Sequence, residues 1–189
     1  KDGHVITVAI ADVAAYIRHG TALDREALKR GNSVYFPDRV VPMLPERISN
    51  DLCSLREGED RACMAVRMVF DRHGEKRRHT FIRGIMKSAA RLSYQEAQAA
   101  IDGRPSDRAA AMLEPALKPL WAAYAVLSAA RDRRAPLDLD LPERKIELNE
   151  AGMVRRVHVP ERLDADRLIE EFMIQSNVAA AEQLEEAHA

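Results

Sequence analysis

The amino-acid sequence predicts an α+β fold, with a mixed or antiparallel sheet built from hairpins and packed against several helices. Strand-like runs come in pairs joined by short turns, and helix-like runs are separate from them. A regular strand–helix alternation, which would produce a parallel sheet, is absent. The 189 residues, of which 47% are hydrophobic and 31% charged, are enough for one domain with a sizeable core.

Strands are predicted from apolar runs that lie between turn-forming residues. Residues 5–11 form a nearly continuous apolar run, typical of a strand buried on both faces. Residues 62–70 place alternate apolar side chains on one face, and a turn at 71–74 leads into a return strand at 76–86. A second hairpin is predicted at 145–159.

Four helices and one irregular segment are predicted between and after these strands. Each helix is indicated by a capping residue or a proline at its start, or by apolar residues at helical spacing. Residues 35–55 are too apolar for a free loop and too interrupted by proline for a helix, so we expect a loop that is packed or functional. The helices are expected after Thr21 or Asp24, from Ser93 to Ile101, from near Pro115 or Pro119, and from about Leu163 to Ala187.

Charge, hydropathy and cysteine content exclude some classes of protein. The net charge of -1 gives no support for RNA binding, so any RNA-binding charge must be gathered in a channel or supplied from outside this chain. No apolar run approaches the roughly 20 residues that cross a bilayer, and the first residues have no signal stretch. Cys53 and Cys63 have no metal-ligand spacing, which favours reduced thiols in a cytoplasmic protein without membrane contact.

Three segments carry side chains with candidate chemistry, and each has a simpler alternative. Asp12 lies where the first strand ends, and it either caps a turn or stands at the rim of a metal site. Tyr35 and Phe36 either fill the core or present a ring that stacks on a base. The basic run on the first hairpin, from Arg72 to Arg83, is expected to be a solvated face, with an RNA-contacting strand as the alternative.

The last predicted helix carries two adjacent glutamates that the helical wheel places differently. With Ile169 at the centre of the apolar stripe, Glu171 points away from the stripe and Glu170 lies on its shoulder. Glu170 is four residues from Asp166, and this like-charge pair is unfavourable unless an arginine, a cation or a ribose hydroxyl offsets it. A solvated helix edge is the alternative.

Four segments and one shorter motif are similar to a known family. They are ITVAIADVAAYI (6–17), YFPDRVVPMLPERISNDLCSL (35–55), KSAARLSYQEA (87–97), RLIEEFMIQSNVAAA (167–181) and PLDLDLPE (136–143). With them, the chain resembles the RNB catalytic domain of the ribonuclease II and ribonuclease R family over essentially its whole length. The shorter motif is closer to the ribonuclease R branch.

The resemblance implies an enzyme that degrades single-stranded RNA processively from its 3′ end and releases nucleoside 5′-monophosphates by magnesium-dependent hydrolysis. It implies that Tyr35 stacks on the terminal base, and that Tyr94 and Glu170 contact the terminal ribose and favour RNA over DNA. These three side chains are then expected to meet at one pocket. Leu139 stands where the family often has an aromatic residue against the base, and leucine offers apolar contact without a π-face. No small-molecule cofactor is implied.

The resemblance also implies that residues 1–189 are only part of the catalytic domain. The family's metal-binding aspartates lie just before the strand that begins here at Val5. A downstream arginine-rich segment and a further glutamate are not included either. We therefore expect the isolated chain to lack nuclease activity. The alternative, from a different class, is a catalytically inactive RNB-like module that binds RNA or a protein partner.

Overall fold

The computed structural model describes residues 3–134 and 144–188 and divides them into two compact units. The first unit contains residues 3–10, 56–134 and 162–188, and the second contains 11–55 and 144–161. Helices and antiparallel hairpins make up both units, so the predicted α+β class is confirmed. None of the helices in the described part of the chain is long and apolar enough to cross a membrane.

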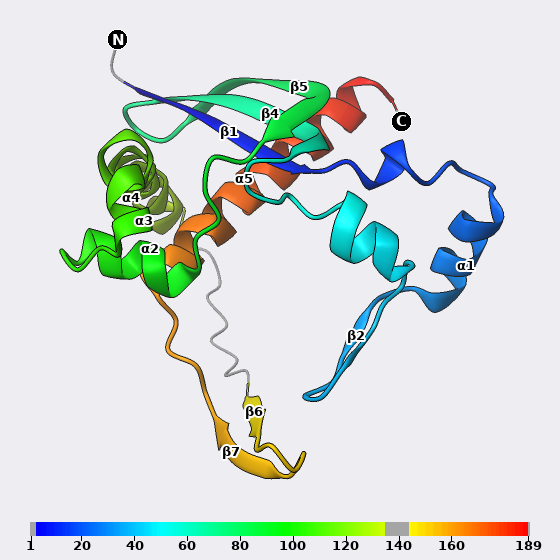
Figure 1. The fold of residues 1–189 in the computed structure, drawn as a ribbon. Coiled ribbons are helices and arrows are strands. Elements are labelled where there is room, and N and C mark those ends of the chain that lie inside the picture. Colours follow the sequence, from blue (N-terminus) through cyan, green and yellow to red (C-terminus); the bar gives the residue numbers. More distant parts are fainter. Residues whose placement is uncertain (1–2, 135–143, 189) are drawn as a thin grey trace. The chain divides into compact units, whose positions relative to one another are not determined.

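A three-stranded sheet in the order β1-β4-β5 forms one layer of the first unit (Figure 1). The predicted hairpin is present, because β4 (Asp60–Asp71) pairs antiparallel with β5 (Lys76–Lys87) and the register slips only between Val69 and Phe70. Gly74 closes the turn with φ 77°, a left-handed conformation that glycine adopts without steric cost.

The first strand, β1 (Gly3–Ala11), was expected to be buried on both faces, and this is wrong. Ile6 is buried, but Val5 is 55% exposed and Ile10 is more than one-third exposed. The reason is the sheet order, which places β1 at an edge among the described strands, with helices packed on one face only. An apolar run cannot by itself distinguish a strand covered on both faces from one covered on a single face.

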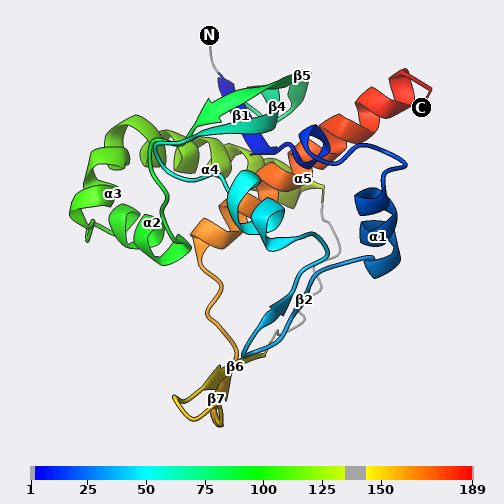
Figure 2. The ribbon, with the colours of Figure 1, turned by 45° about the vertical axis from the view of Figure 1, so that its right-hand side comes forward.

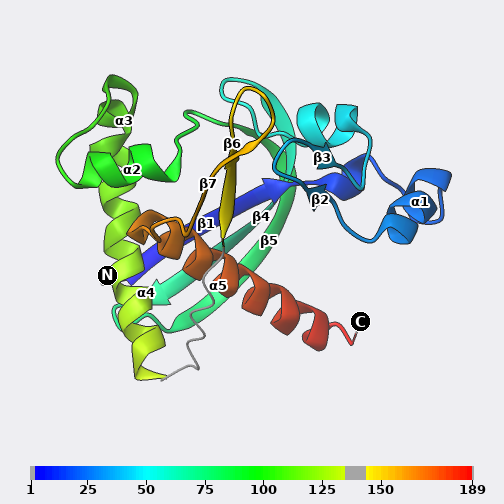
Figure 3. The ribbon, with the colours of Figure 1, turned by 90° about the horizontal axis from the view of Figure 1, so that it is seen from below.

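Two long helices cover the other side of the core (Figure 3). They are α4 (Lys118–Arg133) and α5 (Asp164–Glu186), which agree with the predicted third and fourth helices. Their inner faces meet the apolar face of the sheet, which excludes water from one continuous cluster. The buried members of this cluster are Ile6, Val66, Met68, Phe70, Ala123, Leu127, Leu168, Phe172 and Ala179.

A smaller helical group packs at the start of α4 (Figures 2 and 3). It consists of α2 (Tyr94–Ile101), which was predicted, and α3 (Asp107–Met112), which was not. A wide helical turn, η3 (Leu113–Leu117), joins α3 to α4. Ala100, Ala109 and Leu117 form the buried centre of the group. The single tryptophan, Trp121, packs against both this centre and the main core.

The second unit contains short elements. Helix α1 (Ala22–Arg30) begins after the predicted cap Thr21 and ends at Gly31, whose φ is 78°. The segment predicted to be irregular contains two paired strands, β2 (Val34–Tyr35) and β3 (Val40–Val41), and a wide helical turn, η2 (Arg47–Leu52). The second predicted hairpin is also present, as β6 (Lys145–Leu148) and β7 (Val154–His158).

Candidate functional site

Helix α5 presents its two glutamates differently from the helical-wheel prediction. Glu171 is 1% exposed and faces the protein interior, whereas Ile169, the predicted centre of the apolar stripe, is 42% exposed. The prediction that Glu171 points away from the stripe is therefore wrong. The helical wheel uses hydropathy alone and therefore assigns every charged side chain to the exposed face. A carboxylate that has suitable partners can be buried instead. The buried residues of α5 are Ala165, Leu168, Glu171, Phe172, Gln175, Ser176 and Ala179.

Glu170 lies at the edge of the packed surface, with its side chain 38% exposed. Its carboxylate forms a close ion pair with Arg162, in the segment before α5, and lies 3.8 Å from Nη1 of Arg131 on α4. These two arginines offset the like-charge pair of Asp166 and Glu170, one of the three possibilities that the sequence left open. Asp166 also accepts a hydrogen bond of 2.9 Å from the backbone N–H of Leu163 at the helix start.

Tyr94 is the first residue of α2, and a capping box holds this end of the helix. Ser93 accepts a hydrogen bond from the backbone N–H of Glu96, and the Glu96 carboxylate accepts one from the backbone N–H of Ser93. The latter bond and the Ser93 hydroxyl lower the pKa of Glu96. The aromatic ring of Tyr94 is thus presented on a fixed helix end, and almost half of it is exposed.

An apolar cavity of about 450 Å³ connects Tyr94 with the first turns of α5. Tyr94 and Trp121 line it together with Leu168 and Ile169, which directly precede Glu170. The two helices are joined by a hydrogen bond of 3.0 Å from the backbone N–H of Ala165 to Oε1 of Gln98. The first unit therefore brings the helix end that carries Tyr94 against the segment of α5 that leads to Glu170.

Tyr35 and Phe36 do not fill the core. Tyr35 is 78% exposed on β2, and Phe36 is 47% exposed, with the Arg39 guanidinium 5.1 Å from its ring centroid. The core alternative for this aromatic pair is therefore wrong. Tyr35 belongs to the second unit, and Tyr94 and Glu170 belong to the first. A common pocket for all three stays a prediction.

Asp12 performs the simpler of its two expected roles. Its side chain is buried, and Oδ1 accepts a hydrogen bond of 3.2 Å from the backbone N–H of Ala15, which caps the short helical turn η1 (Val13–Ala15). Burial of Cys53, followed by the charge of Asp12, raises the pKa of that thiol. The role of Asp12 at the rim of a metal site stays a prediction. Leu139 lies outside the described residues.

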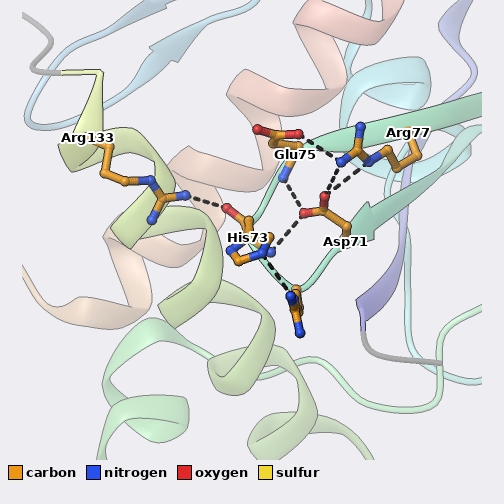
Figure 4. Close-up of polar contacts among 6 residues, drawn as sticks. Asp71, His73, Glu75, Arg77 and Arg133 are labelled. Atoms are coloured by element: carbon orange, nitrogen blue, oxygen red, sulfur yellow. Dashed lines mark hydrogen bonds and ion pairs between the residues drawn. The ribbon is translucent and has the colours of Figure 1, made fainter.

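Two basic residues of the first hairpin, Lys76 and Arg77, form ion pairs within the protein, and Figure 4 shows those of Arg77. Asp71 binds Arg77, which also reaches Glu75 at 2.9 Å, and Arg133 of α4 donates to the backbone carbonyl of His73. Lys76 contacts Glu182 of α5 at 2.8 Å. The contacts of Lys76 and Arg133 hold the hairpin against the helices. Arg72, Arg78 and Arg83 are exposed, as expected for a solvated face, and an RNA-contacting strand stays a prediction.

Two site residues were missed by sequence reasoning: Arg131 and Arg162. Arg162 is eight residues before Glu170, and Arg131 is 39 before it, so neither has the i, i+4 spacing that marks a helical ion pair. In the described ranges, 3–134 and 144–188, no three His, Cys, Asp or Glu side chains are grouped so that they could hold a metal ion.

Comparison with known proteins identifies the class to which this fold and site belong. The model of the RNB domain family matches residues 1–189, so the chain belongs to the RNB domain family. Among curated proteins, it is 42% identical to ribonuclease R of Aquifex aeolicus over 95% of the chain. It is 41% identical to ribonuclease R of Escherichia coli over 98% of the chain. The chain spans 26% and 23% of these two relatives, about a quarter of their length.

Solved structures agree with this membership. Ribonuclease R of Mycoplasma genitalium, in complex with ribose-methylated single-stranded RNA, is 29% identical with a TM-score of 0.91. The match covers 97% of this chain and 29% of that one. Yeast Ssd1, described as a pseudonuclease, is 19% identical with a TM-score of 0.69, over 95% of this chain and 22% of its own. The second likeness shows the fold alone.

Proposed function

We propose that this chain is the substrate-positioning part of a ribonuclease R-type exoribonuclease, which degrades RNA from its 3′ end and releases nucleoside 5′-monophosphates. The observation that carries the proposal is the match of the RNB family model to all 189 residues, together with about 42% identity to proteins named ribonuclease R. That the Mycoplasma relative was solved with single-stranded and with double-stranded RNA supports RNA as the ligand.

In this proposal Tyr94 and Glu170 recognise the terminal ribose. A 2′-hydroxyl is both a donor and an acceptor, and it distinguishes RNA from DNA at a given position. The partly exposed carboxylate of Glu170 supplies an acceptor, and the capped end of α2 holds the Tyr94 phenol on an ordered element. The hydrogen bond from α5 to Gln98 supports the proposal because it fixes the two helices to each other.

Tyr35 stacks on the terminal base in the same proposal. Its ring is exposed on a short hairpin, as a stacking surface must be, and base–aromatic stacking contributes about 1–3 kcal/mol in single-strand binders. Leu139, which lies outside the described residues, is proposed to offer apolar contact to the same base. Magnesium dependence and a cytoplasmic location belong to the proposal as well. The metal ligands would include residues outside the described part of the chain.

The alternative is a catalytically inactive RNB-like module that binds RNA or a protein partner. The observation in its favour is the fold shared with yeast Ssd1, described as a pseudonuclease. Because the fold occurs in that protein too, fold alone does not separate the two functions, and activity has to be measured.

The test is an exoribonuclease assay on the full-length protein that contains this chain, with two substrates of equal length. One ends in a ribonucleotide and the other in a 2′-deoxynucleotide. Glu170→Ala should lower the ratio of kcat/KM for the ribonucleotide substrate to kcat/KM for the 2′-deoxynucleotide substrate by about tenfold or more. This is the size expected when a hydrogen-bonded hydroxyl loses its partner. Tyr35→Ala should weaken binding of both substrates, because stacking does not read the sugar.

Glu185→Ala, on the exposed end of the same helix, is the matched control and should leave both rates unchanged. If the wild-type protein binds RNA but releases no mononucleotides, the inactive-module alternative is correct. For the isolated 189-residue chain we expect no magnesium-dependent release of mononucleotides from poly(A), and measurable release would contradict that expectation.

A further inference from the structure

A single arginine on α4 contacts both adjacent glutamates of α5. Nη1 of Arg131 lies 3.8 Å from Oε1 of Glu170 and 3.6 Å from Oε2 of Glu171. One of these carboxylates is partly open to solvent, and the other is enclosed by protein. The same guanidinium group therefore joins a residue that can touch a ligand to one that cannot.

The enclosed partner gives Arg131 a fixed position. Oε1 of Glu171 accepts a hydrogen bond of 2.9 Å from Nε2 of Gln175, which is also buried, and Oε2 has no hydrogen-bond partner among the residues that the structure describes. A buried carboxylate is strongly unfavourable unless a cation compensates its charge. The Glu171 carboxylate therefore holds the guanidinium group of Arg131, which lies 3.6 Å away, beside it. Glu171 and Gln175 thus anchor the guanidinium group from the interior.

The anchored guanidinium group in turn limits the orientations of Glu170. Arg131 faces its Oε1, and Arg162 forms a close ion pair with its Oε2, so each carboxylate oxygen has its own cation. Arg131 comes from the packed helix α4, whereas Arg162 comes from the segment before α5. The interior side of this arrangement is buried and packed, and an acceptor held in one orientation binds a hydroxyl with less loss of entropy.

We propose that Arg131 and Glu171 are positioning residues that orient the Glu170 carboxylate toward the terminal ribose. This inference rests on the proposed function of Glu170. Neither residue touches the substrate: Glu171 is buried, and Arg131 acts through the carboxylate that it holds. They set the preference for RNA over DNA through the geometry of Glu170.

Arg131 and Glu171 could instead have a purely structural role, in which their ion pair only joins α4 to α5. Two variants separate this structural role from the positioning role. Arg131→Met alone leaves the Glu171 charge buried without compensation, so it should destabilise the protein. Arg131→Met combined with Glu171→Gln removes both charges and should restore most of the stability, as happens when a buried ion pair is replaced as a whole. If positioning is the function, the double variant folds but still misplaces Glu170.

The experiment measures kcat/KM of the full-length protein on the two substrates that end in a ribonucleotide or in a 2′-deoxynucleotide. The double variant should lower the ratio between them by about tenfold, because a misplacement near 1 Å has costs of that order or greater. The loss should come from the ribonucleotide substrate alone. Arg167→Met, which removes an exposed arginine of α5 that lies 3.4 Å from Asp164, is the control and should keep the wild-type ratio.

Thermal unfolding and Trp121 fluorescence establish that each variant is folded. A folded double variant with the wild-type ratio would overturn the proposal, and so would an equal loss on both substrates, which indicates direct phosphate binding by Arg131. If the double variant does not fold, Arg131→Gln combined with Glu171→Gln decides, since Nη1 alone faces both carboxylates and two amides keep a polar contact between α4 and α5 without a cation beside Glu170. A wild-type ratio there overturns the proposal. If Glu170→Ala itself leaves the ratio unchanged, the proposed role of Glu170 has failed instead.

Discussion

At the scale of single residues, the carboxylate of Asp71 stabilises the β4–β5 turn by accepting several hydrogen bonds. Oδ1 accepts hydrogen bonds from the backbone N–H groups of His73 at 2.8 Å and Glu75 at 3.0 Å, and Oδ2 accepts from Arg77. The hydrogen bond from Glu75, then those from His73 and Arg77, outweigh partial burial and lower the pKa of Asp71 to about 2. The ionised carboxylate is therefore the form that the folded turn binds.

The pKa of Asp71 predicts a pH dependence of stability. Because its folded-state pKa lies below the value of about 3.9 in an unfolded chain, its contribution is complete well above pH 4 and is lost as the pH falls toward 2. The difference in free energy of unfolding between wild type and Asp71→Asn, measured with urea, should be constant from pH 7 to about 5 and shrink below that. A difference that stays constant down to pH 2 would contradict the assigned pKa.

At the scale of elements, the β4–β5 hairpin packs through its turn against α4. A Cβ atom on Gly74 would lie 2.8 Å from Cβ of Ala130 and 2.8 Å from the carbonyl oxygen of Val126. Gly74 thus permits both the left-handed turn and the close approach of the helix. The contact of Arg133 with the backbone of His73 adds a second connection between the same two elements (Figure 4).

Gly74→Ala should therefore destabilise the protein by more than Gly103→Ala. Both glycines have positive φ, 77° and 84°, so both substitutions introduce a left-handed alanine that costs about 1–2 kcal/mol. Nothing lies within 4 Å of a Cβ on Gly103, so the excess at Gly74, about 1–3 kcal/mol, measures the crowding against α4. Urea unfolding of the two variants gives the comparison, and equal losses would show that α4 moves away at little cost.

At the scale of the whole molecule, the first unit depends on one core shared by the sheet, α4 and α5. Met68 and Phe70 are among its largest fully buried side chains, and both come from the central strand β4. The remaining described residues form a second unit with its own elements. A change in the shared core is therefore expected to affect the first unit as a whole.

Phe70→Ala should lower the free energy of unfolding of the first unit by about 3–5 kcal/mol, because it removes a buried ring and leaves a cavity. Fluorescence of the single tryptophan reports on this unit, since Trp121 packs against its core. Ile85→Ala is the control on the neighbouring strand, because Ile85 is 75% exposed and should change stability by less than about 0.5 kcal/mol. Equal effects of the two substitutions would contradict the assignment of the core.

Local chemistry explains which elements could be predicted. The cap at Ser93, the turn that ends at Gly74 and the stop at Gly31 lie within a few residues of the elements that they bound, so their signals are readable in order along the chain. Helix α3 was not predicted, although Ser106 caps it, because its six residues are too few to show a helical period. The exposure of one face of β1 could not be predicted, because it depends on which elements pack against the sheet and not on the residues of the strand itself.

The candidate site likewise has features that could be predicted from the sequence and features that only the folded structure shows. The α+β class, the hairpins, most helices and, by resemblance, the family could be predicted from the sequence, because each is carried by neighbouring residues or by whole motifs. The folded structure was needed to show that Glu171 is buried, that Arg131 and Arg162 contact Glu170, and that the Tyr35 ring is exposed. Ion pairs between distant residues have no periodicity along the chain, because their geometry exists only after the helices have packed.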